Sequence, residues 1–229
     1  MTERAFYARS GSPGRDFITL LHPPYTLWHL SYVAIGAALA PDVDWIVLAG
    51  ALLAFLFGLG IGSHALDEAH DRPLRTGLSD GVLWALGIGG IATGVAFGVA
   101  GAYVIGPGIL VWAAIGVLLA TGYALEWSPV IHSDWGFAVS WGAFPVLVGY
   151  WSQTETVSWA ALLMAAVATV LSRAQRELST PARQMRRTGI SMETDGWEPA
   201  ELLATWERPL RLLSIAMPLL ALSLLAVHL

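Results

Sequence analysis

One apolar segment of the sequence runs directly into residues that could bind a metal ion. His64, Asp67, Glu68 and Asp71 stand at positions i, i+3, i+4 and i+7, so they share one face if a helix continues to Asp71. Three carboxylates and an imidazole on one stripe repel one another unless a cation lies among them. Oxygen ligands with imidazole suit magnesium, manganese, iron or zinc. The alternative is a solvated helix end with the following arginines as counter-ions.

A second polar cluster lies between two later apolar segments. Glu126 is followed by His132 and Asp134 in a stretch without arginine, and these side chains could complete the site begun by His64 and Asp67. Alternatively, Asp134 or Ser133 caps the following helix and His132 is solvated. We expect both clusters on the same side of a membrane, which favours one shared metal site.

The elements that position these residues are predicted to be transmembrane helices. The chain is 55% hydrophobic and 13% charged, with a mean hydropathy of +0.60, whereas soluble domains are about 25% charged. The sequence therefore predicts an all-α polytopic membrane protein, with residues 1–229 as a single membrane domain. Seven apolar runs are long enough to be considered as spans: Tyr25–Ala40, Trp45–Ser63, Gly81–Ala100, Pro107–Ala124, Gly136–Trp151, Val157–Ser172 and Leu210–His228.

The charge distribution predicts the orientation of these spans. All 12 basic residues are arginines, and they fall in residues 1–21, after the second span, and in and beside the loop 173–209. Alternate gaps contain none, so the positive-inside rule predicts a cytoplasmic N-terminus and an external C-terminus. Residues 1–21 lack a small-residue cleavage site and are expected to be a cytoplasmic lead-in.

Composition also excludes several kinds of chemistry. The chain has no cysteine and no lysine, which excludes disulfides, thiolate metal ligands, iron–sulfur clusters and lysine Schiff bases. The net charge of -5 argues against nucleic acid as a partner.

Three other features have structural or functional interpretations. Arg173 and Arg176 could hold a diphosphate or could bind anionic lipid headgroups. His29 is expected to be a packed core histidine. Gly90, Gly94 and Gly98 form a small-residue ridge that predicts close helix packing.

Several of these motifs together resemble the UbiA-type intramembrane prenyltransferases, over about residues 17–172. The likeness is carried by the following segments: Leu21–Thr26 at the start of the first span, His64, Asp67 and Asp71 ahead of Arg72–Arg75, Tyr123 with Pro129, and Trp141–Tyr150. Where the family has a second aspartate motif, this chain reads Leu171–Glu177 and contains arginines instead. The chain is also about two helices shorter than is usual for that family.

The resemblance implies a lipid or isoprenoid substrate and a divalent metal. Asp67 and Asp71, with Glu68 beside them, are then the catalytic carboxylates and magnesium ligands. The resemblance places Arg72, Tyr123, Arg173 and Arg176 around the substrate.

Three functions remain open at this stage. The first is a prenyltransferase-like membrane enzyme. The second is an iron- or zinc-dependent membrane oxidoreductase or hydrolase acting on a lipid, with ligands drawn from both clusters: His64, Asp67, Glu68, His70, Glu126, His132 and Asp134. The third is a non-enzymatic lipid-binding accessory protein.

The predicted orientation can be tested with reporter fusions. A reporter fused after His228 should lie outside the cell, and one inserted near Met192 should lie inside, because the arginines flank the inner ends of the spans. Protease accessibility in intact and permeabilised cells measures both positions. An internal C-terminus contradicts the seven-span count.

Overall fold

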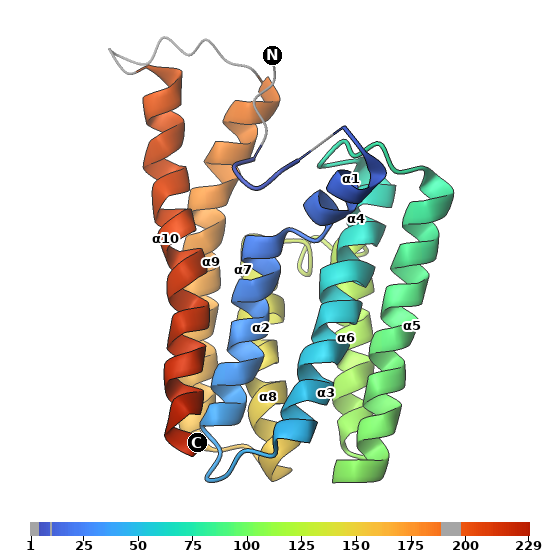
Figure 1. Ribbon diagram of the computed structural model, residues 1–229, viewed down its shortest axis with the longest axis vertical. Coiled ribbons are helices and arrows are strands. Elements are labelled where there is room, and N and C mark those ends of the chain that lie inside the picture. The colour runs from blue at the N-terminus through green and yellow to red at the C-terminus, as the bar shows by residue number, and fades with distance from the viewer. Residues whose placement is uncertain (1–4, 10, 189–197) are drawn as a thin grey trace.

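The computed structural model describes residues 5–9, 11–188 and 198–229. Within these residues every regular element is helical, which confirms the all-α class, and the long helices pack side by side along one axis (Figure 1). The elements in chain order are α1 (Pro13–Leu20), α2 (Pro23–Ala38), α3 (Trp45–Phe55), η1 (Leu56–Ser63), α4 (His64–Asp71), α5 (Asp80–Ile105), α6 (Ile109–Ala124), α7 (Asp134–Ala138), η2 (Val139–Ala143), α8 (Phe144–Thr154), α9 (Trp159–Thr188), α10 (Pro199–Leu225) and η3 (Ala226–His228).

Three helical segments are long and apolar enough to cross a membrane. They are Trp45–Asp71, Asp80–Ile105 and Pro199–His228, and at most 28% of their most apolar windows is buried inside the protein. Apolar side chains that face outward along most of a long helix indicate a lipid environment. A shorter apolar helix covers Ile109–Ala124. With 16 residues it is about 24 Å long.

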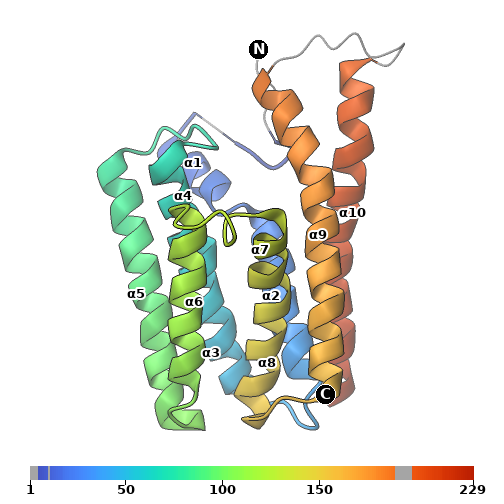
Figure 2. The same ribbon diagram turned by 180° about the vertical axis from the view of Figure 1, so that it is seen from behind.

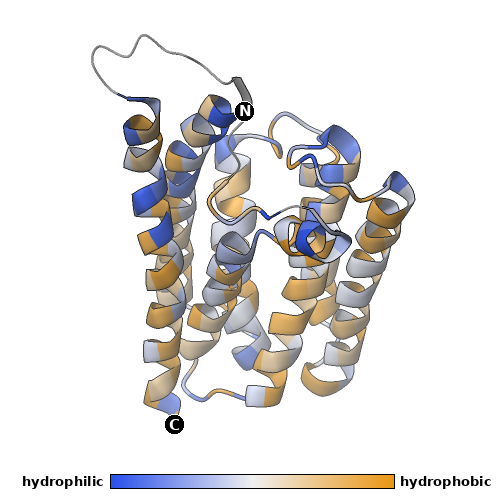
Figure 3. Cartoon of the chain, turned by 45° about the horizontal axis from the view of Figure 1, so that its top comes forward, coloured by the Kyte–Doolittle hydropathy of each residue, from blue (hydrophilic) through white to orange (hydrophobic). Residues whose placement is uncertain are grey.

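Polar residues gather at one end of the helix bundle. This end is formed by α1, α4, the α4–α5 loop and the tips of α9 and α10, where hydrophilic residues are concentrated (Figure 3). The described arginines all belong to these elements or to the segment before α1, so we call it the arginine-rich end. The middle of the bundle is apolar.

The segment 173–209, expected as the cytoplasmic connection before the last span, is largely helical. α9 continues to Thr188 and α10 begins at Pro199, because this stretch is rich in alanine, arginine, glutamine and glutamate, which are good helix formers. The tips of both helices rise well beyond the start of α2 and beyond the α6–α7 loop (Figures 1 and 2). Residues 189–197 lie outside the described part of the chain.

Glycines allow α5 to pack closely against the helical segment Trp45–Asp71 and against α6. A Cβ atom on Gly90 would lie 2.6 Å from the backbone nitrogen of Gly62, in the π-helical stretch η1. A Cβ on Gly94 would lie 3.0 Å from the carbonyl oxygen of Ala54, and one on Gly98 would lie 2.9 Å from Cβ of Ala113. The predicted packing ridge is therefore confirmed.

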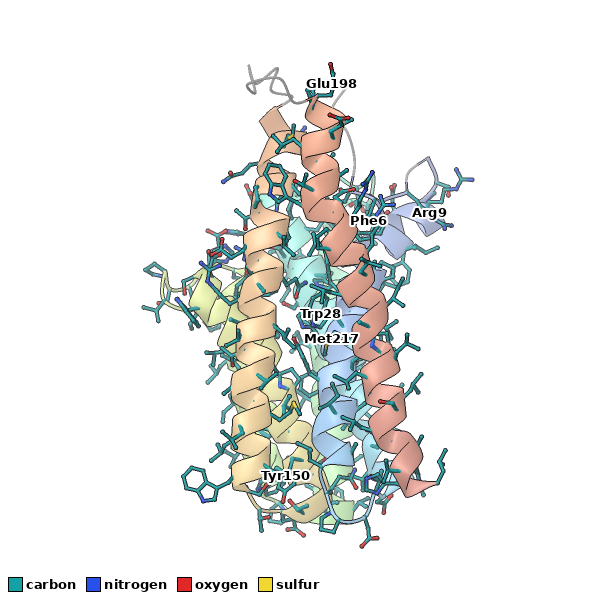
Figure 4. All side chains as sticks on the ribbon, turned by 90° about the vertical axis from the view of Figure 1, so that its left-hand side faces the viewer. Phe6, Arg9, Trp28, Tyr150, Glu198 and Met217 are labelled. Atoms are coloured by element: carbon teal, nitrogen blue, oxygen red, sulfur yellow. The ribbon has the colours of Figure 1, made fainter. Side chains whose placement is uncertain are left out.

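The largest core cluster surrounds α2. Trp28 and Tyr32 are fully buried, and the Trp28 indole donates a hydrogen bond to the Tyr32 hydroxyl at 2.7 Å. Met217 of α10 belongs to the same cluster and lies at the height of Trp28 between α9 and α10 (Figure 4). This core fixes α9 and α10 against α2.

The contact between α2 and α8 makes a direct prediction. A Cβ on Gly149 would lie 2.1 Å from the carbonyl oxygen of Val33, and a Cβ on Gly36 would lie 2.1 Å from that of Val146. Gly149→Ala should therefore separate the helices and lower the free energy of unfolding by about 1–3 kcal/mol. Gly81→Ala is the control, because open space surrounds Gly81. Equal unfolding temperatures of the two variants in detergent would contradict the close contact.

Candidate functional site

A cavity of about 250 Å³ lies at the arginine-rich end. We call it the polar chamber. It is enclosed by the N-terminal segment 5–8, the start of α2, η1 with α4, the loop after α4, the end of α6, the α7–η2 segment and α9. Its ionisable lining among the described residues combines several arginines and histidines with a single carboxylate and three tyrosines: Arg75, Arg176, Arg183, Arg186, His22, His29, His64, Asp67, Tyr7, Tyr25 and Tyr123.

The three histidines are each anchored through one ring nitrogen. Nδ1 of His22 lies 2.9 Å from the Tyr7 hydroxyl, Nδ1 of His29 lies 2.9 Å from the carbonyl oxygen of Trp141, and Nδ1 of His64 lies 3.2 Å from that of Gly60. The rings of His22 and His64 are stacked, with centroids 4.5 Å apart. Burial, and then the charge of His64, lower the pKa of His22 well below its usual value. The His22 ring is therefore neutral at pH 7.

Glu68 organises the loop that follows α4. It is fully buried, and its carboxylate accepts hydrogen bonds from the backbone N–H of Leu74 at 2.8 Å and of Thr76 at 2.7 Å. The Thr76 hydroxyl donates a third hydrogen bond, at 2.9 Å. The carboxylate thus holds both neighbours of Arg75, whose backbone has a φ of 51°. Glu68 does not line the chamber, but it fixes the residue that does.

Arg72 braces the same loop. Its guanidinium donates to the carbonyl oxygens of Leu78 at 2.7 Å and Thr76 at 3.3 Å, and it forms an ion pair with Asp80. Arg72 was expected to bind substrate, whereas here its donors are used by the protein. Asp71, at the end of α4, is likewise outside the chamber lining.

The second predicted cluster lies beside the chamber. Nε2 of His132 lies 3.4 Å from the Glu126 carboxylate, and Nδ1 of the same ring lies 2.9 Å from the carbonyl oxygen of Tyr123. The Tyr123 ring stacks on His132, with centroids 4.6 Å apart. The charges of Glu126 and His132 act on Asp67, so the two clusters are close enough to interact electrostatically.

Asp134 is neutralised by arginines. Its carboxylate lies 3.0 Å from Nε of Arg176 and 3.4 Å from Nη2 of Arg173. Arg173 also pairs with Glu177, at 2.5 Å, and does not line the chamber. Asp134 and Arg173 therefore connect α7 to α9.

Only part of the predicted site comes together in the cavity. The predicted residues that line it are His64, Asp67, Tyr123 and Arg176, whereas Glu68, Asp71, Arg72, Glu126, His132, Asp134 and Arg173 do not. Among the described residues no group of three or more histidine, aspartate or glutamate side chains is arranged to hold a metal ion. The donor set does not fit the divalent metal that the family resemblance implies, because Glu68 and Asp134 are engaged by protein donors.

Sequence reasoning missed much of the chamber. Gln175, Ser179, Arg183 and Arg186 line it together with Arg176, and their spacings of three and four residues mark one face of a helix. This polar stripe is a signal that could have identified α9 as a wall. Tyr7 and His22 carry no comparable pattern.

A second, apolar cavity of about 450 Å³ lies lower in the bundle between α3, η1, α5, α6 and α8. Its rim includes Ile46 and Val104, which are 80% and 64% exposed, so it opens onto the apolar outer surface. Leu59 and Trp141 line both cavities. The polar chamber and the apolar cavity therefore adjoin each other at these two residues.

No family model, curated protein or solved structure matches the chain.

The role of Glu68 can be separated from that of its neighbour Asp67. Glu68→Ala leaves buried loop donors without an acceptor and should lower the free energy of unfolding by about 3 kcal/mol or more. Asp67→Ala is the control, because Asp67 has no hydrogen bond or ion pair to another described residue, and it should not lower stability. Thermal unfolding with and without EDTA measures both. Equal losses, or a loss for Glu68→Ala that appears only without EDTA, would contradict the loop role.

Proposed function

We propose that this protein is an integral membrane enzyme that acts on an isoprenoid or another long-chain lipid, with its reactive headgroup in the polar chamber. The observation that carries the proposal is the junction of the two cavities at Leu59 and Trp141. An amphipathic molecule needs a polar site continuous with an apolar one, and a mostly apolar pocket with a few convergent polar groups is typical of ligand sites. The sizes of the two cavities support one extended ligand.

The arrangement in the membrane follows from the arginines. We propose seven spans in a UbiA-like bundle, with the N-terminus and the helical tips of α9 and α10 in the cytoplasm and the C-terminus outside. All 12 basic residues on one side support this orientation. The chamber then lies at the cytoplasmic edge of the bilayer, where the headgroup of a lipid lies.

The reaction that the resemblance implies is prenyl transfer. The allylic carbon–oxygen bond breaks, diphosphate leaves with the electron pair, and a nucleophilic acceptor forms the new bond to carbon and loses a proton. Asp67 is the only carboxylate in the described lining of the chamber, so we assign it as the acceptor of that proton. The arginines stabilise the leaving diphosphate.

A non-catalytic lipid-binding role is the second candidate. The commitment of Glu68 to the loop and of Asp134 to arginines favours it, since few acid–base groups then remain in the chamber. Turnover of a bound prenyl diphosphate in the presence of candidate acceptors distinguishes the two.

The proposed lipid site can be tested by filling the apolar cavity. Gly50 and Gly58 line it, and a Cβ on either meets open space. Gly58→Leu and Gly50→Leu should therefore weaken binding of a long-chain prenyl lipid by about tenfold or more, because a leucine occupies the space of the tail. Binding is measured by calorimetry in detergent.

The matched control is Gly89→Leu. Gly89 also faces open space but lies outside the cavity, on the exposed face of α5. Its binding should equal that of the native protein. Unchanged affinity in the two cavity variants would remove the proposed tail site.

A further inference from the structure

The polar chamber has more positive charge than the protein neutralises. Of its four described arginines, Arg176 pairs with Asp134 and Arg186 pairs with Glu207. Arg75 and Arg183 have no ion pair with another described residue. Arg75 is exposed, and an exposed arginine needs no partner, whereas Arg183 is partly buried on the cavity wall, where a guanidinium is an anion receptor.

Arg183 is the more informative of the two. It is partly buried on α9, and burial together with the charge of Arg176 lowers its pKa. Asp67 acts on it electrostatically, yet the two side chains form no ion pair. A guanidinium keeps its charge under these conditions. No described carboxylate forms an ion pair with Arg183, so this side chain is available to pair with an anion in the chamber.

Two neutral groups of the lining also lack hydrogen-bond partners among the described residues. They are Nε2 of His22 and Oε1 of Gln175, and Gln175 is only 3% exposed. Burial raises the pKa of Tyr7, so its hydroxyl keeps its proton and can donate to Nδ1 of His22. Nε2 of the neutral ring then carries the proton and can donate to a ligand oxygen.

The carboxylates that could hold a bridging cation are mostly committed elsewhere. Magnesium bridges a diphosphate through carboxylate oxygens, and the described lining presents Asp67 alone. The same lining presents the guanidinium groups of Arg75 and Arg183 and the Nε2–H donor of His22. The recognition chemistry of the chamber is therefore that of an anion with more than one negative charge.

We propose that the polar chamber binds a phosphate or diphosphate group directly through Arg183, assisted by Arg75 and His22, without a bridging divalent cation. When the bound phosphate or diphosphate belongs to a lipid ester, the proposal specifies the headgroup of the lipid in the proposed function and rests on that function. Glu68 contributes as a positioning residue, because it holds the loop on both sides of Arg75.

The test compares three probes by calorimetry on the full-length protein in detergent: geranylgeranyl diphosphate, geranylgeraniol and inorganic diphosphate, each in EDTA and in magnesium. We expect geranylgeranyl diphosphate to bind in EDTA within about threefold of its affinity in magnesium, and at least tenfold more tightly than geranylgeraniol. Arg183→Gln should weaken diphosphate binding by about tenfold to a hundredfold and leave geranylgeraniol unchanged.

Arg173→Gln is the matched control, since it removes the same charge from the same helix outside the chamber, and it should bind like the native protein. Arg183→Lys keeps the positive charge and is the control for a loss of binding that is caused by misfolding. The unfolding temperature of each variant also detects misfolding. Arg183→Lys should retain more affinity than Arg183→Gln.

Three results overturn the anion site but leave the proposed lipid function standing: binding that requires magnesium, equal affinity for geranylgeraniol and its diphosphate, or unchanged binding by Arg183→Gln. Inorganic diphosphate that binds as tightly as the lipid diphosphate, with no binding of geranylgeraniol, supports the anion site and removes the lipid function. Binding of none of the three probes overturns both.

Discussion

The exclusion of charge from the middle of the helix bundle is the constraint on which the rest of the structure depends. An unpaired charge in an apolar environment costs several kcal/mol, and the stretches Trp45–Ser63, Gly81–Ala124 and Val157–Ser172 contain no charged residue. Charged groups are therefore concentrated outside these apolar stretches. The arginine-rich end collects them, and the polar chamber lies there, lined by the start of α2 and by α9 among other elements.

Within that end, buried polar groups hold the functional surfaces in place. Glu68 satisfies three loop donors at once, and Asp134 joins α7 to two arginines of α9. Tyr7 from the N-terminal segment contacts His22. These contacts leave Arg183, Asp67 and the free edge of His22 facing the chamber, directly above the apolar cavity. The same separation of scaffold and site explains why only Asp67, among the three carboxylates of α4, lines the chamber.

Sequence periodicity predicted the helical class and the glycine ridge, because both depend on local spacing. It could not separate Asp67 from Glu68, since adjacent residues on a helix point about 100° apart and only the packing of α4 decides which faces the loop. Arg173 and Arg176 were favoured over Arg183 because they stand where the resembling family has its second aspartate motif, and Arg183 lies about two turns further along α9. The contribution of Tyr7 and His22 depends on long-range folding of the N-terminal segment, which has no local signature.

Native mass spectrometry of the protein released from its own membranes tests the central claim most directly. If the two adjoining cavities form one lipid site with an anionic headgroup position, the protein should retain a long-chain lipid bearing a phosphate or diphosphate, and fragmentation of the complex should release that headgroup. A protein that is released without lipid, or with membrane phospholipids only in the proportions of the surrounding bilayer, would contradict the account.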